Sequence, residues 1–272
     1  MNTIVRNTER SCIKPSQLPD WMISHGLATI STEECAYLFG CDKKEVPNKL
    51  VYLIDKRRIV SIARGLYLVN PQESIIMGAP EPTRYINDLM NYYDTEYCLG
   101  WLSAAKLYQA SHQAAQVFQV ATQRTISNRI IGRNRLQFYN RSYVNKITKQ
   151  RIVLNNSNVL VSSLGATMLM VCADVLISGG IDNVATIIYE LAQNNNNYLE
   201  DIINNARLFP TAALRRLGWL LENTAQNKDA DVLANIIDNK TNPSLLSPYD
   251  SHSGEIDKKW QLIINRHVEK DE

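Results

Sequence analysis

Lysine and arginine gather in two segments of the sequence, and the chemistry that they offer is the binding of an anion. Between residues 42 and 67, seven basic side chains stand against three acidic ones. Between residues 121 and 151 there are eight basic residues and no acidic one, although the net charge of the whole chain is only +2. Segregated positive charge is the electrostatic footprint of a protein that binds a polyanion. For each segment, the alternative is a solvated surface neutralised by the acidic remainder.

The first segment predicts contacts with double-stranded DNA. Asparagine suits bidentate pairing with adenine, lysine reaches guanine or a phosphate, and arginine holds the backbone. The candidate DNA-binding residues are Lys43, Lys44, Asn48, Lys49, Arg57, Arg58 and Arg64. The alternative is a module for protein contacts, on which the lysines only add solubility.

The second segment is interleaved with strand-like stretches, so several of its arginines are expected to share one face of a sheet. We hypothesise that this face contacts an anionic partner, which would be an RNA, a nucleotide or an acidic protein surface. An equally weighted alternative is that this face only makes the protein soluble. The candidate residues are Arg124, Arg129, Arg133, Arg135 and Arg141.

Catalytic motifs are absent from the sequence. It has no C-x-x-C pair, no histidines at zinc-ligand spacing, no glycine-rich phosphate loop and no G-x-S-x-G elbow. Asp174 is a lone carboxylate in an apolar stretch, and it is interpreted as a capped or salt-bridged structural group rather than as a buried acid. The sequence therefore predicts a protein that is not an enzyme and needs no metal or cofactor.

Composition places the chain among folded globular proteins. Its 272 residues are 45% hydrophobic and 21% charged, which excludes a disordered chain. The longest apolar run, residues 168–173, is far shorter than the roughly 20 residues of a membrane span. No secretory signal opens the chain, and the five cysteines are odd in number and widely spaced. We therefore expect a cytoplasmic protein without a membrane partner.

The first segment lies within a compact series of elements. A short helix begins at Pro19 and ends at Gly26, and the capping box of Ser31 and Glu34 opens a second helix that ends at Gly40. A third helix has apolar positions at 50, 53 and 54, and strands at 59–62 and 66–69 flank a turn. This order predicts a winged helix-turn-helix, whose third helix enters the major groove while the hairpin meets the phosphates.

Residues 71–82 contain three prolines and little periodicity, which indicates a linker. The prediction is thus an α+β protein with a winged helix-turn-helix domain at 1–70, a linker at 71–82 and a second domain at 83–272. The second domain is predicted to be mixed α/β, with a central sheet and a helical C-terminal portion.

Four local expectations concern that helical portion. A helix is expected at 163–177, and Asp182 is expected to cap the next one. A later helix is lined by leucines, with Arg215 and Arg216 pointing outward, and residues 260–264 are expected to form a strand that returns to the central sheet.

The sequence resembles the AbiEi-type antitoxins of bacterial type IV toxin–antitoxin (abortive infection) systems. Four stretches carry most of the likeness: Arg-Gly-Leu-Tyr-Leu-Val at 64–69, Tyr-Cys-Leu-Gly-Trp-Leu-Ser-Ala-Ala at 97–105, Gly-Gly-Ile-Asp-Asn-Val-Ala at 179–185 and Leu-Arg-Arg-Leu-Gly-Trp-Leu-Leu-Glu at 214–222. Two C-terminal stretches, at 246–248 and 257–265, also resemble the family. One departure is Ser-Leu-Gly-Ala at 163–166, where the family is expected to have a Pro-Glu-Arg-like step.

The resemblance implies an antitoxin that binds repeats in its own promoter as a repressor and acts in phage defence. It also implies a second domain that opposes a nucleotidyltransferase-like toxin, without a stable complex of the two proteins. One alternative is a stand-alone winged-helix regulator whose second domain senses a ligand or dimerises. Another is a nuclease-like enzyme that holds nucleic acid on its basic sheet.

Overall fold

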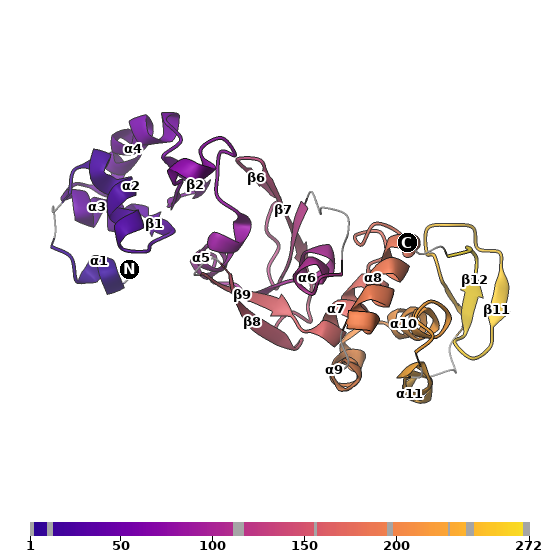
Figure 1. Ribbon diagram of the computed structural model, residues 1–272. Coiled ribbons are helices and arrows are strands. Elements are labelled where there is room, and N and C mark those ends of the chain that lie inside the picture. The colour runs from indigo at the N-terminus through magenta and orange to yellow at the C-terminus, as the bar shows by residue number, and fades with distance from the viewer. Residues whose placement is uncertain are drawn as a thin grey trace. The chain divides into compact units, whose positions relative to one another are not determined.

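The computed structural model describes residues 3–9, 13–110, 117–154, 157–194, 198–227, 229–237 and 242–268. Their contacts group the chain into two compact units (Figure 1). Unit 1 comprises Met1–Glu96, Ile126–Gln137 and Ile152–Val159, and unit 2 comprises Tyr97–Thr125, Phe138–Arg151 and Leu160–Glu272. Helices and several separate sheets make this an α+β protein, as the sequence predicts.

Unit 1 contains five helices and a small sheet with the strand order β1-β3-β2 among its described residues. The bounds are α1 (Thr3–Arg6), α2 (Leu18–Ser24), β1 (Thr29–Ser31), α3 (Thr32–Phe39), α4 (Val46–Asp55), β2 (Ile59–Ala63), β3 (Leu66–Val69), α5 (Ile86–Tyr92) and β6 (Arg129–Ile131).

The ends of α3 follow from its sequence. The backbone amide of Ser31 donates to the Glu34 carboxylate at 2.8 Å, and the amide of Glu34 donates to Ser31 Oγ at 3.3 Å. This reciprocal pair is the predicted capping box. At the other end Gly40 adopts φ 63°, a left-handed conformation that glycine takes without strain.

Helix α4 is amphipathic because its apolar positions recur at helical spacing. Val46, Leu50 and Leu53 are buried in a core shared with α2 and α3, and Pro47 lies in the first turn, where its missing amide proton costs nothing. Strands β2 and β3 pair antiparallel about a turn in which Gly65 has φ 85°. Strand β1 pairs with β3. It has only three residues, which are too few for an alternating apolar–polar pattern to be recognised in the sequence.

The remaining elements belong wholly or partly to unit 2. They are β4 (Tyr97–Leu99), α6 (Trp101–Leu107), β5 (Val117–Thr122), β7 (Asn134–Asn140), β8 (Lys149–Leu154), β9 (Ser157–Ser162), α7 (Leu164–Ala173), α8 (Ile181–Asn194), α9 (Leu199–Asn205), α10 (Thr211–Asn223), α11 (Asp229–Ile236), β10 (Ser244–Leu245), β11 (Glu255–Asp257) and β12 (Leu262–Ile264).

A mixed sheet runs in the order β6-β7-β5-β4-β9-β8. Strand β4 pairs antiparallel with β5 and parallel with β9. Helix α7 follows β9 and contacts α6, α8, α9 and α10. Its residues from Leu164 to Cys172 are all buried, which accounts for the apolar run in the sequence. In the part of the chain that the structure describes, no helix is long and apolar enough to cross a membrane.

Two predicted helix boundaries are wrong. Helix α7 ends at Ala173 rather than at residue 177, and a hydrogen-bonded turn links it to α8. Helix α8 begins at Ile181, so Asp182 lies inside its first turn and is not the capping residue. The Asp182 carboxylate instead forms an ion pair with Arg266.

The expectation that Arg215 and Arg216 point outward is also wrong. They are only 1% and 6% exposed. Arg216 donates to the carbonyl oxygens of Leu245, Leu246 and Cys172 at 3.0–3.1 Å, and Arg215 donates to the carbonyl of Asn242 at 2.8 Å. The segment around β10 covers α10, and these two guanidinium groups donate to three of its backbone carbonyls.

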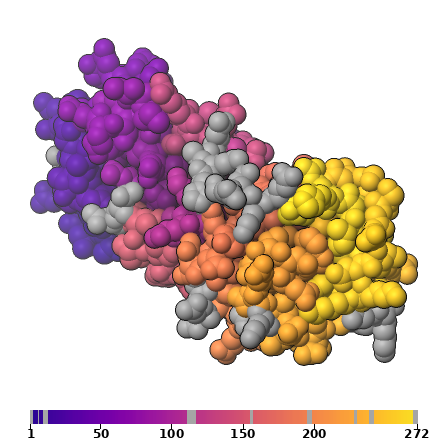
Figure 2. Space-filling view, turned by 45° about the vertical axis from the view of Figure 1, so that its right-hand side comes forward, coloured from indigo at the N-terminus to yellow at the C-terminus, as the bar shows by residue number. Residues whose placement is uncertain are grey.

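The C-terminal strand does not return to the six-stranded sheet, contrary to the prediction. It forms β12 in a separate sheet with the order β10-β12-β11. This yellow region lies beside the orange helix α10 (Figures 1 and 2). Trp260, which precedes β12, is fully buried, and a Cβ atom at Gly218 of α10 would lie 2.0 Å from its ring. The close approach of ring and helix explains why a glycine stands there.

Candidate functional site

The first candidate site is the solvent-facing side of α4. Because Val46, Leu50 and Leu53 face the core, the positions between them face solvent. Asn48 and Lys49 are exposed there, and Lys44 is exposed in the turn before the helix, as the predicted DNA-binding role requires. The amide of Asp42 donates to the Glu45 carboxylate at 3.3 Å, which fixes the turn that leads into the helix.

Three of the predicted DNA-binding cations have carboxylate partners. Lys43 Nζ lies 3.0 Å from Glu33, Lys49 Nζ 3.4 Å from Glu45, and the Arg58 guanidinium 2.7 Å from Asp20. All three pairs are solvent-accessible, and such pairs contribute only about 0–1 kcal/mol. The hydrogen bond from Lys43 lowers the pKa of Glu33. Because these ion pairs are weak, the three cations can exchange their carboxylate partners for another anion, such as a phosphate group.

The other predicted DNA-binding cations, Lys44, Arg57 and Arg64, are exposed, and no described carboxylate lies within ion-pair distance of them. Arg57 has φ 54°, which turns the chain sharply between α4 and β2. At the hairpin turn, the carbonyl of Arg64 accepts a hydrogen bond from Tyr92 Oη at 2.9 Å. A Cβ atom at Gly65 would lie 3.0 Å from that hydroxyl, so Tyr92 of α5 fixes the position of the turn.

Sequence reasoning missed two residues of the α4 surface. Val51 and Tyr52 are 51% and 64% exposed, although both are large hydrophobic residues. Lys56 Nζ lies 5.9 Å from the centre of the Tyr52 ring. The helical spacing that placed positions 50, 53 and 54 in the core already puts 51 and 52 on the opposite side.

The five arginines of the second segment have different surroundings. Arg129, in unit 1, donates to the carbonyl of Ile62 at 2.8 Å and to the hydroxyl of Tyr93. Arg133 and Arg135, also in unit 1, are exposed. Arg124 and Arg141 belong to unit 2, where Arg124 is exposed and Arg141 is half-buried. Contact of these residues with an anionic partner stays a prediction.

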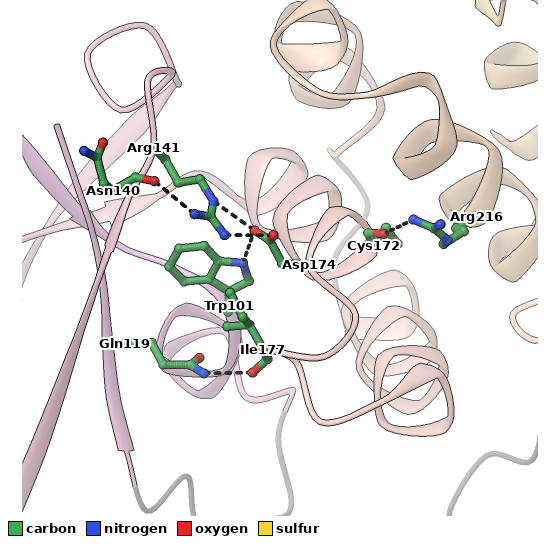
Figure 3. A network of polar contacts seen from close by, with 8 residues as sticks. All are labelled: Trp101, Gln119, Asn140, Arg141, Cys172, Asp174, Ile177 and Arg216. Atoms are coloured by element: carbon green, nitrogen blue, oxygen red, sulfur yellow. Dashed lines mark hydrogen bonds and ion pairs between the residues drawn. The ribbon is translucent and has the colours of Figure 1, made fainter. Parts of the chain in front are cut away.

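Arg141 is part of a polar network in unit 2, shown in Figure 3. Its guanidinium donates to both oxygens of Asp174, at 2.8 and 3.2 Å, and Trp101 Nε1 donates to the same carboxylate at 3.0 Å. The guanidinium also lies 5.6 Å from the Trp101 ring. Both oxygens of Asp174 are engaged, and of the two structural interpretations from the sequence, a capped or a salt-bridged carboxylate, the structure shows the salt bridge.

The backbone around Trp101 is shaped for this network. Trp101 has φ 48°, which is an uncommon backbone conformation for a large residue. Such a conformation persists only where the surrounding structure fixes it. A Cβ atom at the preceding Gly100 would lie 2.2 Å from the Met170 methyl group, so α7 packs directly on the backbone. Gln119 accepts from the amide of Leu102 and donates to the carbonyl of Ile177, both at 2.9 Å. These bonds connect β5, α6 and the turn after α7.

The departure at residues 163–166 also has a packing explanation. Ser163 Oγ donates to Asp201 at 2.8 Å, and the amide of Gly165 donates to the same carboxylate at 2.6 Å. A Cβ atom at Gly165 would lie 2.5 Å from the backbone nitrogen of Ile202. The segment therefore lets α9 approach α7 closely. Among the described residues, no group of three or more His, Cys, Asp or Glu side chains is placed to hold a metal ion.

Comparisons with known proteins agree with this architecture. The crystal structure of the Rv2827c protein from Mycobacterium tuberculosis is similar, with a TM-score of 0.67 and 12% sequence identity over 91% of this chain and 90% of that one. The likeness concerns the fold. No curated protein matches the sequence. Residues 98–223, which hold the Trp101–Arg141–Asp174 network and helices α7 to α10, match the family model of the AbiEi antitoxin C-terminal domain. This match supports an AbiEi-type antitoxin.

Proposed function

We propose that this chain is the antitoxin of a type IV toxin–antitoxin system, and that it both represses its own operon and counteracts a nucleotidyltransferase-like toxin. The observation that carries the proposal is the AbiEi antitoxin domain at residues 98–223. An antitoxin of this kind works in the cytoplasm, serves phage defence and needs no stable complex with the toxin.

Repression requires binding of promoter DNA, and the order of elements in unit 1 supports it. Helix α2, strand β1, helices α3 and α4 and the β2–β3 hairpin follow one another as in a winged helix-turn-helix, with the sheet order β1-β3-β2. We assign this module to residues 1–70, the linker to 71–82 and the antitoxin domain to 83–272. The residues of its core cluster lie between Val5 and Val69, which supports the first boundary.

The chemistry of the α4 surface suggests a division of labour on the DNA. Asn48 offers a bidentate pair to adenine, and Val51 and Tyr52 offer apolar surface to a thymine methyl group. Lys44, Arg57 and Arg64 are available for phosphates, while Lys43, Lys49 and Arg58 exchange carboxylate for phosphate. Phosphate contacts position the helix, and the contacts of Asn48, Val51 and Tyr52 select the sequence.

Co-expression with the neighbouring gene tests the proposal. The neighbour alone should arrest growth, and co-expression of this chain from an unrelated promoter should restore it. A reporter behind the native promoter should be silenced by the same chain. Lys44→Ala combined with Asn48→Ala should relieve silencing and leave growth rescue intact, whereas Lys106→Ala, an exposed lysine of unit 2, should change neither. Failure of the parent chain to restore growth would refute the antitoxin assignment.

A further inference from the structure

The β6–β7 turn, which the sequence places with the second basic segment, lies in unit 1 beside the hairpin strand β2. The guanidinium of Arg129 on β6 donates to the carbonyl of Ile62 on β2 at 2.8 Å, and its charge lies 5.5 Å from the Tyr93 ring. In Figure 1 β6 lies near β2.

The turn itself is held tightly against the chain that follows β3. The amide of Arg133 donates to the carbonyl of Met77 at 2.9 Å, and Asn134 Nδ2 donates to the carbonyl of Pro80 at 2.8 Å. Gly132 has φ 60°, and a Cβ atom there would lie 2.6 Å from the Met77 carbonyl. Any other residue at 132 would push the turn away, so the position of Arg133 is fixed by backbone contacts.

These contacts enclose a surface hollow of about 540 Å³. Its lining is apolar apart from one serine and two cations, and no acidic residue among the described ones contributes to it. The residues that matter here are Arg57, Val60, Ser61, Ile76, Met77 and Arg133.

Arg57 and Arg133 both line this hollow, and both are exposed. No described carboxylate lies within ion-pair distance of either one. The guanidinium of Arg133 has a thioether contact, to Met77 Sδ at 3.9 Å, and a thioether is a weak acceptor. Two guanidinium groups in one hollow without a counter-ion offer a site for a phosphate, which each can bind through paired N–H donors.

We propose that Arg133 extends the DNA-binding surface of unit 1, so that Arg57 and Arg133 hold the sugar–phosphate backbone of promoter DNA at this hollow. The inference rests on the proposed DNA-binding function. The apolar lining from Val60 and Met77 suits the deoxyribose between successive phosphates. Arg133 thereby acts in repression rather than in a separate antitoxin surface, and the second basic segment serves two purposes.

The test is fluorescence anisotropy with the full-length chain across a series of KCl concentrations. The probes are a labelled duplex of the protein's own promoter region and a scrambled duplex of equal length. Arg133→Gln removes the charge and keeps hydrogen-bonding capacity. Loss of one phosphate contact should make the negative slope of log K against log[KCl] shallower by about 0.9, which corresponds to roughly fivefold weaker binding at 0.15 M salt. Arg57→Gln should have the same effect, on both duplexes.

The matched control is Arg135→Gln, an exposed arginine on β7 that does not line the hollow. Its slope should equal that of the parent, and all variants should keep the parent's melting temperature. An unchanged slope for Arg133→Gln, or an equal loss for Arg135→Gln, overturns the inference while leaving DNA binding by α4 in place. A parent chain that binds neither duplex overturns both proposals. Loss of toxin rescue by Arg133→Gln with unchanged DNA binding would assign the hollow to a protein partner instead and refute ours.

Discussion

Arginine is used in opposite ways in the two units. In unit 1, Arg57 and Arg64 extend into solvent and remain available to an incoming anion. In unit 2, Arg216 is 6% exposed and its donors are taken by three backbone carbonyls. Burial lowers the pKa of Arg216, yet the group stays charged at neutral pH. The comparison teaches that the number of basic residues in a segment does not reveal a binding surface; burial and existing partners decide.

The largest expected effect concerns the buried side of this comparison. Arg216→Ala should lower the free energy of unfolding by about 3 kcal/mol or more, because three carbonyl oxygens lose their donor in a site closed to water. Urea denaturation followed by circular dichroism measures the change. Arg216→Lys should be only partly better, since an ammonium group lacks the planar fork that reaches Cys172 and Leu245 together.

Arg207→Ala is the control for that experiment, because Arg207 is exposed. It should change the free energy of unfolding by less than about 0.5 kcal/mol. If Arg216→Ala and Arg207→Ala had equal effects, the distinction between buried and exposed arginines would lose its energetic basis.

The next effect concerns the exposed side. Replacement of Lys43, Lys44 and Lys49 by alanine should weaken promoter binding by roughly 100-fold at 0.15 M salt, if each lysine contributes one phosphate contact with a slope of about 0.9. Anisotropy titrations at several KCl concentrations give both affinity and slope. Stability should hardly change, since all three side chains are exposed. Unaltered affinity in a folded variant would remove α4 from the DNA interface.

Arg141 and Asp174 form an intermediate case, with side chains 27% and 22% exposed. A double-mutant cycle with Arg141→Gln and Asp174→Asn should give a coupling energy of roughly 1–2 kcal/mol, less than for a fully buried pair. Thermal or urea unfolding of the four proteins measures it. A coupling energy near zero would show that Trp101 and the backbone, rather than the ion pair, hold this network together.

The smallest effect tests whether the carboxylates on the proposed DNA-binding surface compete with phosphate. Glu33→Gln frees Lys43 and should strengthen promoter binding by about two- to threefold, within the range of a solvent-exposed ion pair. Lys43 lowers the pKa of Glu33 below the value near 4.3 that the group has in the unfolded chain, so the carboxylate is fully ionised at neutral pH. The gain should therefore be constant between pH 6 and 8. Weaker binding by Glu33→Gln would contradict the competition.

Much of unit 1 could be predicted from the sequence because its signals are local. The capping box at Ser31, the glycine at 40 and the spacing of Leu50 and Leu53 all lie within a single helix or at its ends, and the structure contains each of them. Strands β1 and β4 have only three residues each, so their identity comes from pairing with distant strands.

The errors in unit 2 arise where a distant segment determines burial. Arg215 and Arg216 follow the pattern of an outward helix face, and only the chain around β10, some thirty residues later, converts that face into an interior. Asp182 has the residue type of a helix cap, yet its partner is Arg266, 84 residues away. The same holds for the candidate site, since nothing near Arg133 in the sequence indicates that it lies beside Met77.

Unit 1 is discontinuous in the chain, and this shapes the order in which a newly made molecule can assemble. The helices and hairpin up to Val69 can pack as soon as they leave the ribosome. The β6–β7 turn and residues 152–159 are synthesised only after more than fifty further residues of unit 1 and unit 2. At the usual elongation rate of about 5–20 residues per second, Arg133 joins Arg57 several seconds after α4 has formed. If the proposed DNA interface is right, a nascent chain would meet DNA first through α4, and would gain the contacts of the β6–β7 turn only after part of the antitoxin domain has been made.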